Sequence, residues 1–312
     1  MPELPEVETI ARGLAKSVTG EVIESVWLGQ KKEPLKSPAP EIASLLEQSR
    51  ITQVRRMGKH IVFDLDRGDE AAMSASRRTR KSPDRKSRRK GSASSAAQPA
   101  DRRLTAGSIA GHARAQWIVH LGMTGRLELC DAQAEIAKHT HAILKLSSNR
   151  ELRFVDPRRF GRLSVSRSAD FAATGVEPLE VDLDRFVELF RGRKTPIKSA
   201  LLNQRLLRGV GNIYADESLF RAGIRPRRRA RSITHEQWRR LYLAIQEVLN
   251  EAIALGGSSV SDYVNADGEE GFFQLQHRVY GREGEPCLVC KTAIKRVVIA
   301  GRSSHYCRKC QQ

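Results

Sequence analysis

The stretch LLNQRLLRGVGNIYADESLFRAGIRP, residues 201–226, has the pattern of two helices joined by a turn that contains two glycines. We predict that the second helix begins at Asn212, whose side chain caps it, with Asp216 and Glu217 as acidic residues near its start. Backbone amides left free at such a helix start bind phosphate, so the pattern favours a grip on a DNA backbone. From this stretch alone, an ordinary helical hairpin stays open as the alternative.

The chain around this stretch divides into a β-rich part and a helical part. Partial alternation of Val, Ile, Leu and Phe predicts strands in residues 21–30, 50–66, 116–130, 139–147 and 150–167. From Asp184 onward the apolar spacing is helical, in residues 184–192, 196–207, 212–223 and 235–257. A chain of 312 residues accommodates one large or two moderate domains, and the change of pattern places the second domain's start near residue 180.

The cysteines are concentrated at the C-terminal end of the sequence. Sixteen residues separate the pair Cys287 and Cys290 from the pair Cys307 and Cys310. Two Cys-x-x-Cys pairs at this separation predict one tetrahedral, structural Zn²⁺ site in a zinc ribbon. Two redox dithiols, or a chance arrangement, are the alternatives. A zinc ion with four thiolate ligands has no open position for catalysis, so its expected role is to present the intervening hairpin.

The charge balance points to an anionic polymer as the partner. The sequence has 54 Lys and Arg against 36 Asp and Glu, a net charge of +18. Membrane binding is the competing interpretation, but there is no run of 18 apolar residues and no signal peptide pattern. We therefore expect a cytosolic protein that does not bind membranes.

Residues 68–115 are predicted to be a disordered basic insertion. The segment is rich in Ser, Ala, Arg and Lys and has almost no large apolar residues, so it cannot bury enough surface to offset its ordering entropy. Between Arg77 and Lys90 there are nine basic residues and one acidic residue, which is nearly half of the net charge. The segment from Asp184 to the C-terminus is also rich in Arg and Lys, so the expectation of a nucleic-acid partner does not depend on the insertion.

The chain begins with MPELPEVETI, and apolar residues recur with helical spacing between positions 7 and 18. Pro5 suits the first turn of a helix, and Glu6 opposes the positive end of the helix dipole. Pro2 and Glu3 precede this helix and contribute nothing to it. The helical pattern therefore leaves these two residues unexplained.

Six motifs, in order, closely resemble bacterial formamidopyrimidine-DNA glycosylases: MPELPEVETI, HLGMTGRL, DPRRFG, GVGNIYADESLFRAGI, VYGREGEPC and the cysteine ribbon. The resemblance covers the chain except for the insertion. It implies an α+β fold: an N-terminal β-sandwich with a catalytic N-terminal helix, then a helix-two-turn-helix domain with a zinc ribbon. The expected divisions are a catalytic domain (1–175), a DNA-binding domain (176–257), a lesion-capping loop (258–281) and the ribbon (282–312).

The activity implied by this resemblance is that of a bifunctional DNA glycosylase and AP lyase of base excision repair. Such an enzyme removes 8-oxoguanine and formamidopyrimidines from double-stranded DNA and cleaves the abasic strand by β,δ-elimination. Abasic DNA is a further expected partner. The LPEVE opening resembles the purine-specific branch. The alternatives are an endonuclease VIII-like glycosylase for oxidised pyrimidines and a noncatalytic zinc-ribbon DNA-binding protein. We expect a monomer in the bacterial cytoplasm, associated with the nucleoid.

The resemblance also assigns the catalytic residues. With the initiator methionine removed, the amine of Pro2 is expected to attack the sugar C1′ of the damaged nucleotide and form an iminium intermediate. An α-amine titrates near pH 8, at about 7.7–8.0, so part of it is neutral and nucleophilic near neutral pH. Glu3 is expected to move protons between the sugar ring oxygen, water and the leaving base. Lys59 matches a second catalytic amine that contacts the phosphate and assists base release and elimination, although an exposed strand lysine is its alternative. Glu6 completes the predicted catalytic set.

The residues expected to contact DNA come from both halves of the chain. Met123, Arg158 and Phe160 match the residues that fill the gap left when a base is flipped out. Without the resemblance, Met123 is more simply a core residue and DPRRF a turn with solvated arginines. Asn212 and Arg302 match phosphate clamps, and the predicted DNA-binding set also includes Lys198. Residues 258–276 correspond to a loop that closes over the extruded base.

Overall fold

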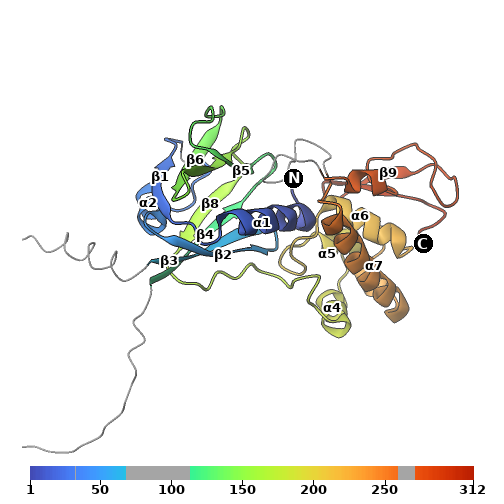
Figure 1. Cartoon of the computed structure of the whole chain (residues 1–312). Coiled ribbons are helices and arrows are strands. Elements are labelled where there is room, and N and C mark those ends of the chain that lie inside the picture. The colour runs from blue at the N-terminus through green and yellow to red at the C-terminus, as the bar shows by residue number, and fades with distance from the viewer. Residues whose placement is uncertain (32, 68–112, 259–270) are drawn as a thin grey trace, which may run out of the picture.

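The computed structural model describes residues 1–31, 33–67, 113–258 and 271–312. The strands of the N-terminal part form one body, and the helices after residue 180 and a small two-stranded ribbon form the other (Figure 1). The predicted α+β class, with a β-sandwich, a helical domain and a C-terminal ribbon, is confirmed. In the described part of the chain, no helix is long and apolar enough to cross a membrane.

Two four-stranded antiparallel sheets form the N-terminal sandwich, with strand orders β1-β6-β7-β5 and β2-β3-β4-β8. Apolar residues of both sheets share one core. The short helix α2 (Ala39–Leu46), which the sequence did not predict, contacts β1 and β8. The strands are β1 (Ile23–Leu28), β2 (Arg50–Met57), β3 (His60–Arg67), β4 (Ala113–His120), β5 (Arg126–Asp131), β6 (Thr140–Leu146), β7 (Arg150–Val155) and β8 (Arg162–Ser166).

The helical domain contains α4 (Leu183–Phe190), α5 (Ile197–Leu201), α6 (Asn212–Arg221) and α7 (His235–Ala254). The predicted helix over residues 196–207 is too long, because α5 ends at Leu201. The side chain of Asn203 accepts a hydrogen bond from the backbone N–H of Arg205 (3.0 Å), and this local turn competes with continuation of the helix. Two single 3-10 turns, Ala230–Ser232 and Phe273–Gln276, flank α7.

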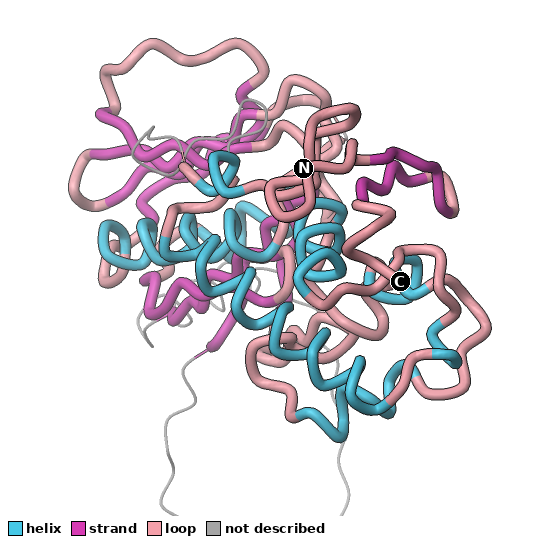
Figure 2. Tube along the Cα trace, turned by 90° about the vertical axis from the view of Figure 1, so that its right-hand side faces the viewer, coloured by secondary structure: helices cyan, strands magenta, loops and turns pink. Residues whose placement is uncertain are grey.

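The ribbon is an antiparallel hairpin of β9 (Lys295–Ile299) and β10 (Arg302–Tyr306). Figure 2 shows its strands on the opposite side of the molecule from those of the sandwich. Strand β10 contacts α6. The hairpin therefore extends from the start of the second helix of the Gly-x-Gly motif.

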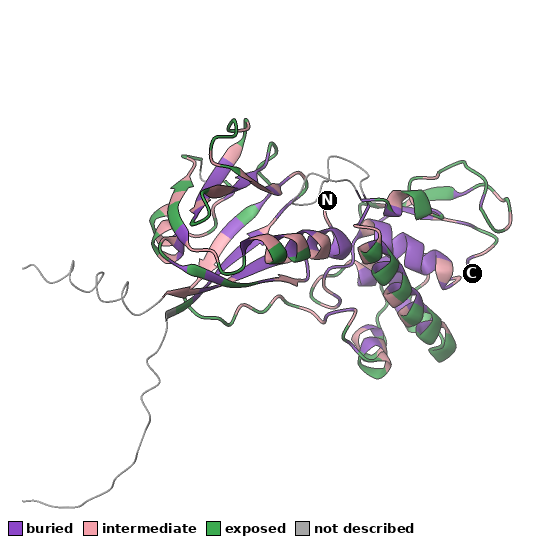
Figure 3. Ribbon diagram, viewed as in Figure 1, coloured by how far each residue is buried: buried purple, intermediate pink, exposed green. Residues whose placement is uncertain are grey.

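Helix α1 (Leu4–Val18) joins the two bodies (Figure 3). Val7, Ile10 and Leu14 lie in the core of the sandwich, whereas Leu4 belongs to the core of the helical domain. The backbone N–H of Leu4 donates to the carbonyl of Gly209 (3.0 Å). The first turn of α1 is thus placed at the junction of the two domains.

The predicted insertion connects β3 to β4 at the end of this strand pair that is remote from Met123. Residues 68–112 lie outside the described part of the chain, but residues 113–115 belong to β4, so the insertion is shorter than predicted. β3 and β4 pair from His60↔His120 to Arg67↔Ala113. Because a strand rises about 3.4 Å per residue, these two ends are roughly 24 Å apart. The turn that carries Met123 follows the His120 end.

Candidate active site

Two buried carboxylates at the start of α1 are held by the helical domain. The backbone N–H of Glu3 donates to Oε2 of Glu6 (2.7 Å). Oε1 of Glu3 accepts from the backbone N–H of Ile213 (3.1 Å), at the start of α6. Oε1 of Glu6 accepts from the hydroxyl of Tyr214 and from the backbone N–H of Ser258 (2.8 Å). The helical domain therefore fixes the position of both side chains, and Pro2 lies directly before them.

The second glycine of the Gly-x-Gly turn makes this contact possible. A Cβ atom at Gly211 would lie 2.2 Å from Cδ of Glu3, a distance that no side chain can tolerate. Any other residue would displace either the Glu3 carboxyl group or the turn. Gly211 of the Gly-x-Gly turn therefore also allows the Glu3 side chain to pack against the start of α6.

Glu3 and Lys59 are buried ionisable groups that influence one another. Glu3 is 3% exposed and Lys59 is 8% exposed, in the turn between β2 and β3. Burial raises the pKa of Glu3, an effect opposed by the charge of Lys59. Burial lowers the pKa of Lys59, an effect opposed by the charges of Glu3 and Glu6 and reinforced by that of Arg302. Both shifts favour the neutral forms, and the interpretation of Lys59 as an exposed strand lysine is wrong.

Unlike its neighbour Glu6, Glu3 has one carboxylate oxygen without a hydrogen bond. Oε2 of Glu3 is buried, and within the described ranges no group donates to it. A buried oxygen of this kind is available to a substrate atom or to a proton in transit. Together with the raised pKa, this geometry suits a group that gives and takes protons.

Asn212 and the ribbon hairpin meet at the start of α6. The prediction that Asn212 caps the helix is wrong, because Gly211 occupies the cap position and Asn212 is the first helical residue. Its Nδ2 instead donates to the hydroxyl of Ser303 (3.2 Å), next to the exposed Arg302 at the start of β10. Its buried Oδ1 accepts no hydrogen bond from the residues that the structure describes.

Lys198, which we expected to contact DNA, is fully buried. Its ammonium group pairs with Oδ1 of Asp216 (2.7 Å) and donates to the backbone carbonyl of Ser303 (2.6 Å). Oδ2 of Asp216 accepts from the backbone N–H of His305 (2.8 Å). In this structure the Lys198 side chain therefore fixes strand β10 to α5 and α6 and presents no charge at the surface.

Met123, Arg158 and Phe160 project from two adjacent loops of the sandwich. Met123 is 41% exposed and Phe160 is 52% exposed, so neither is a core residue. The guanidinium carbon of Arg158 lies 4.8 Å from the centre of the Phe160 ring, in a cation–π contact. The turn before β5 approaches the other loop so closely that a Cβ atom at Gly122 would lie 2.5 Å from the backbone carbon of Phe160. The two loops that carry the three side chains therefore lie against each other.

The four C-terminal cysteines have the arrangement of a zinc site. The Sγ atoms of Cys287, Cys290, Cys307 and Cys310 all lie within 4.8 Å of one another. The separations are 3.9 Å for Cys287–Cys310 and 3.4 Å for Cys290–Cys307. Tetrahedral ligands at the usual Zn–S distance of about 2.3 Å are roughly 3.8 Å apart, so the residues fit one Zn²⁺. No further ligand position is left open.

Comparison with known proteins shows the family of the chain. Residues 1–163 match the family described as the formamidopyrimidine-DNA glycosylase N-terminal domain. This chain belongs to the formamidopyrimidine-DNA glycosylase family. Residues 174–264 match the H2TH domain of the same glycosylases, and residues 284–312 match the zinc finger found in FPG and IleRS.

Relatives of this glycosylase family match the chain from end to end. A formamidopyrimidine-DNA glycosylase of Solibacter usitatus is 41% identical, and the alignment covers 100% of both chains. The crystal structure of the MutM (Fpg) protein of Thermus thermophilus is 38% identical with a TM-score of 0.76, covering 99% of this chain and 98% of that one. A Lactococcus lactis FPG mutant in complex with Fapy-dG-containing DNA is 28% identical with a TM-score of 0.80, and 100% of each chain is covered.

Sequence reasoning missed several buried acids that support the sites of this family member. Glu217 accepts hydrogen bonds from the backbone N–H groups of Arg278 (2.9 Å), Val279 (3.0 Å) and Tyr280 (2.8 Å), and so anchors the segment before the ribbon. Asp216 and Glu217 were interpreted only as an acidic helix start. The sequence feature that could have indicated their role is the presence of two adjacent carboxylates in a helix with many apolar residues. A carboxylate buried in such a helix requires hydrogen-bond partners.

Asp156 is a second such residue and holds the two exposed loops of the glycosylase sandwich together. Its Oδ1 accepts from the hydroxyl of Thr124 (2.6 Å) and from the backbone N–H of Arg158 (3.2 Å), and its Oδ2 accepts from that of Gly161 (2.7 Å). The residue is completely buried. One carboxylate therefore sets the position of the Met123 turn relative to the Arg158–Phe160 loop.

We expect Asp156→Ala to lower the free energy of unfolding by about 3 kcal/mol, because three donors, of which that of Gly161 is buried, lose their buried acceptor. Urea unfolding followed by circular dichroism measures this change. Thr124→Val is the matched control, since it removes one of the three hydrogen bonds and is expected to cost about 1 kcal/mol. Equal losses in the two variants would show that Asp156 does not act as the common acceptor.

Proposed function

We propose that this chain is a bifunctional DNA glycosylase and AP lyase of base excision repair that acts on oxidised purines. The observation that carries the proposal is the buried set of Glu3, Glu6 and Lys59 beside Pro2, with pKa shifts that favour a neutral Lys59 amine and a protonated Glu3. A catalyst that forms a Schiff base and transfers protons requires groups in these forms.

In the proposed reaction, the amine of Pro2 bonds to C1′ of the damaged nucleotide as the bond from C1′ to the base breaks. Loss of the amine proton and opening of the sugar ring give an iminium ion. Glu3, whose pKa is raised by burial, supplies a proton to the ring oxygen or to the leaving base and later takes one back. The iminium ion withdraws electrons, and β,δ-elimination then breaks the strand on both sides of the sugar. Lys59 assists as a second amine.

The relatives support oxidised purines as the substrate class. A Lactococcus lactis relative has been solved with DNA that contains Fapy-dG, and a MutM structure contains carbocyclic 8-oxo-G DNA. Oxidised pyrimidines form a second candidate class, because another Lactococcus lactis complex contains an oxidised pyrimidine. For both classes, we propose that Met123, Arg158 and Phe160 fill the gap in the duplex.

The rest of the DNA interface follows from the helical domain and the ribbon. We propose that Asn212 and Arg302 bind backbone phosphates and that Lys198 supports the hairpin from within. We also propose that residues 258–281 cap the extruded base; residues 259–270 of this segment lie outside the described part of the chain. The proposed division of the chain remains 1–175, 176–257, 258–281 and 282–312. Bacterial relatives favour a cytoplasmic protein, and affinity for DNA favours association with the nucleoid.

The test is base excision from matched duplexes that contain 8-oxoguanine, a formamidopyrimidine or an oxidised pyrimidine. We expect the two purine lesions to be released fastest and both strand-cleavage products to appear. In Glu3→Gln, base release is expected to fall by about a thousandfold while lesion binding remains, because the proton-transferring group is lost. If the unaltered protein binds lesion DNA specifically but does not excise the base, the proposal is wrong and the chain is a noncatalytic DNA-binding protein.

A second expectation concerns the insertion. Because it leaves the sandwich roughly 24 Å from the Met123 end of the β3–β4 pair, replacing residues 70–112 with a short turn should leave excision of the lesion unchanged. The same deletion removes many positive charges, so the salt dependence of nonspecific DNA binding should become less steep. Both quantities are measured on the deleted and full chains across a salt series. Loss of excision at low salt would place the insertion in the active site.

A further inference from the structure

A small pocket of about 100 Å³ adjoins Lys59. Lys59, His60, His120 and Arg208 line it, together with residues of the connection between the domains. No acidic residue is among the lining residues. The pocket is thus surrounded by hydrogen-bond donors next to a residue of the proposed active site.

His120 can donate a hydrogen bond without carrying charge. Burial and the nearby charges of His60, Arg162 and Lys59 lower its pKa to about 4, so it is neutral near pH 7. The backbone N–H of Gly122 donates to Nδ1 of His120 (3.1 Å), which leaves the ring proton on Nε2. A neutral imidazole with its proton on Nε2 is a donor suited to an anion.

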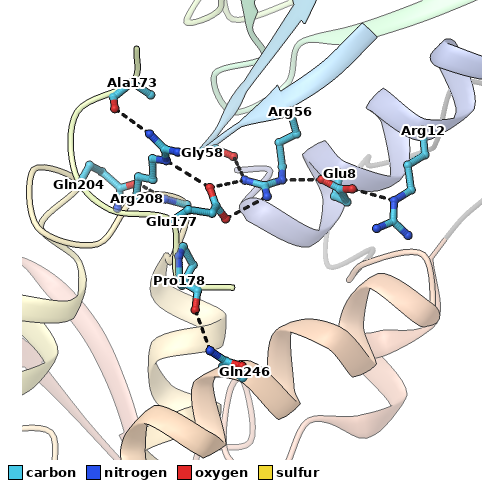
Figure 4. A network of polar contacts seen from close by, with 11 residues as sticks. Glu8, Arg12, Arg56, Gly58, Ala173, Glu177, Pro178, Gln204, Arg208 and Gln246 are labelled. Carbon is cyan, nitrogen blue, oxygen red and sulfur yellow. Dashed lines mark hydrogen bonds and ion pairs between the residues drawn. The ribbon is translucent and has the colours of Figure 1, made fainter. Parts of the chain in front are cut away.

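Glu177 fixes the side chain of Arg208 (Figure 4). Nε of Arg208 donates to Oε2 of Glu177 (3.1 Å), and Nη1 donates to the carbonyl of Ala173 (2.9 Å). The stem of Arg208 also packs on Gly58, where a Cβ atom would lie 3.3 Å from that of Arg208. Within the described ranges, Nη2 of Arg208 makes no hydrogen bond, so one edge of the guanidinium group remains available.

The charge of Arg208 is in excess within its network. Arg56 already engages both oxygens of Glu177 (2.9 Å each) and also Glu8 (2.6 Å). With Arg12, which pairs with Glu8, three arginines face two glutamates, and the network carries one surplus positive charge. The side chain of Arg208 is 20% exposed, so an anion from outside can reach it.

We propose that Arg208, held in position by Glu177, is a ligand of a DNA backbone phosphate at this pocket, in addition to the phosphate contact that the family resemblance implies for Lys59. The inference rests on the proposed function, since it takes the anion to be a phosphate beside the nucleotide that reaches Pro2. Lys59 supplies a second donor, and His120 a third. The guanidinium group, fixed at Nε and Nη1, then meets the phosphate with its remaining edge.

The test measures equilibrium binding of lesion-containing duplex across a salt series for the full chain and for Arg208→Gln. We expect the dissociation constant to rise about tenfold and the slope of log K against log salt to become shallower by about one unit. Arg185→Gln is the control for lost charge, because Arg185 lies on α4 in an exposed pair with Glu188. Arg208→Lys keeps the charge, so we expect its slope of log K against log salt to equal that of the unaltered chain. Identical slopes for the unaltered chain and Arg208→Gln would overturn the proposal.

A methylphosphonate scan separates this contact from a general effect on the fold. Each duplex has one backbone phosphate made neutral, and binding is measured for the unaltered chain and for Arg208→Gln. At one position near the lesion, neutralising the phosphate should weaken DNA binding by the unaltered chain but have little further effect on DNA binding by Arg208→Gln. An equal loss in both proteins at every position would overturn the assignment of Arg208. Excision of the lesion by the unaltered chain tests the proposed function separately from the contact made by Arg208.

Discussion

An N-terminal extension is expected to abolish the covalent complex that borohydride traps between this protein and lesion DNA. The extension converts the amine of Pro2 into an amide, which has no free electron pair for attack on C1′. The fold should survive, because α1 is held from Leu4 onward by the cores of both domains. Lesion binding should therefore remain while the trapped product disappears.

The measurement is mass spectrometry of the borohydride adduct for the extended chain and for the chain with a free Pro2. Pro2→Gly is the matched control, because it keeps an α-amine at the same place and is expected to retain weak trapping. Equal trapping of the extended and processed chains would exclude Pro2 as the nucleophile. Lys59 would then become the leading candidate, since its pKa is already lowered by burial.

Replacing Cys307 by Ser is expected to release the metal and to weaken lesion binding by about a hundredfold, because Arg302 loses the hairpin that presents it. Cys307 is completely buried in a small apolar cluster with Cys287 and Ile294, and the ribbon has little other core. The sandwich has its own core and should stay folded.

Metal content by mass spectrometry and binding to an abasic-site duplex test this expectation. Arg302→Gln in the zinc-bound protein is the companion variant, because it removes the side chain and leaves the ribbon intact. If Cys307→Ser loses its metal and still binds lesion DNA as tightly as the unaltered chain, the ribbon does not contribute to the interface.

The parts of the molecule that the sequence predicted well are those defined by local spacing. Two Cys-x-x-Cys pairs specify a metal site because the ligands are close in sequence within each pair, and the four Sγ atoms are indeed clustered. The helix that follows Gly211 was placed correctly for the same reason. The α1 pattern was also visible, since its apolar spacing is regular over several turns.

The parts that were not predicted depend on contacts between distant residues. Nothing near Glu3 in the sequence indicates that Ile213 donates to it, because this partner lies in another domain. Likewise, the buried state of Lys198 follows from Asp216 and from the ribbon. The cap assigned to Asn212 was wrong because a close approach by Glu3 requires glycine before it.

The position of Leu4 in the core of the helical domain has a consequence for synthesis of the chain. The proposed nucleophile is among the first residues to leave the ribosome, but the partners of Glu3 and Glu6 extend to Ser258. At about 5–20 residues per second, these partners follow roughly 10–50 s later. The sandwich can form during that interval, whereas the carboxylates of Glu3 and Glu6, which we propose to be catalytic, stay hydrated and unpaired until the helical domain is made. A nascent chain thus gains its reactive centre only near the end of translation.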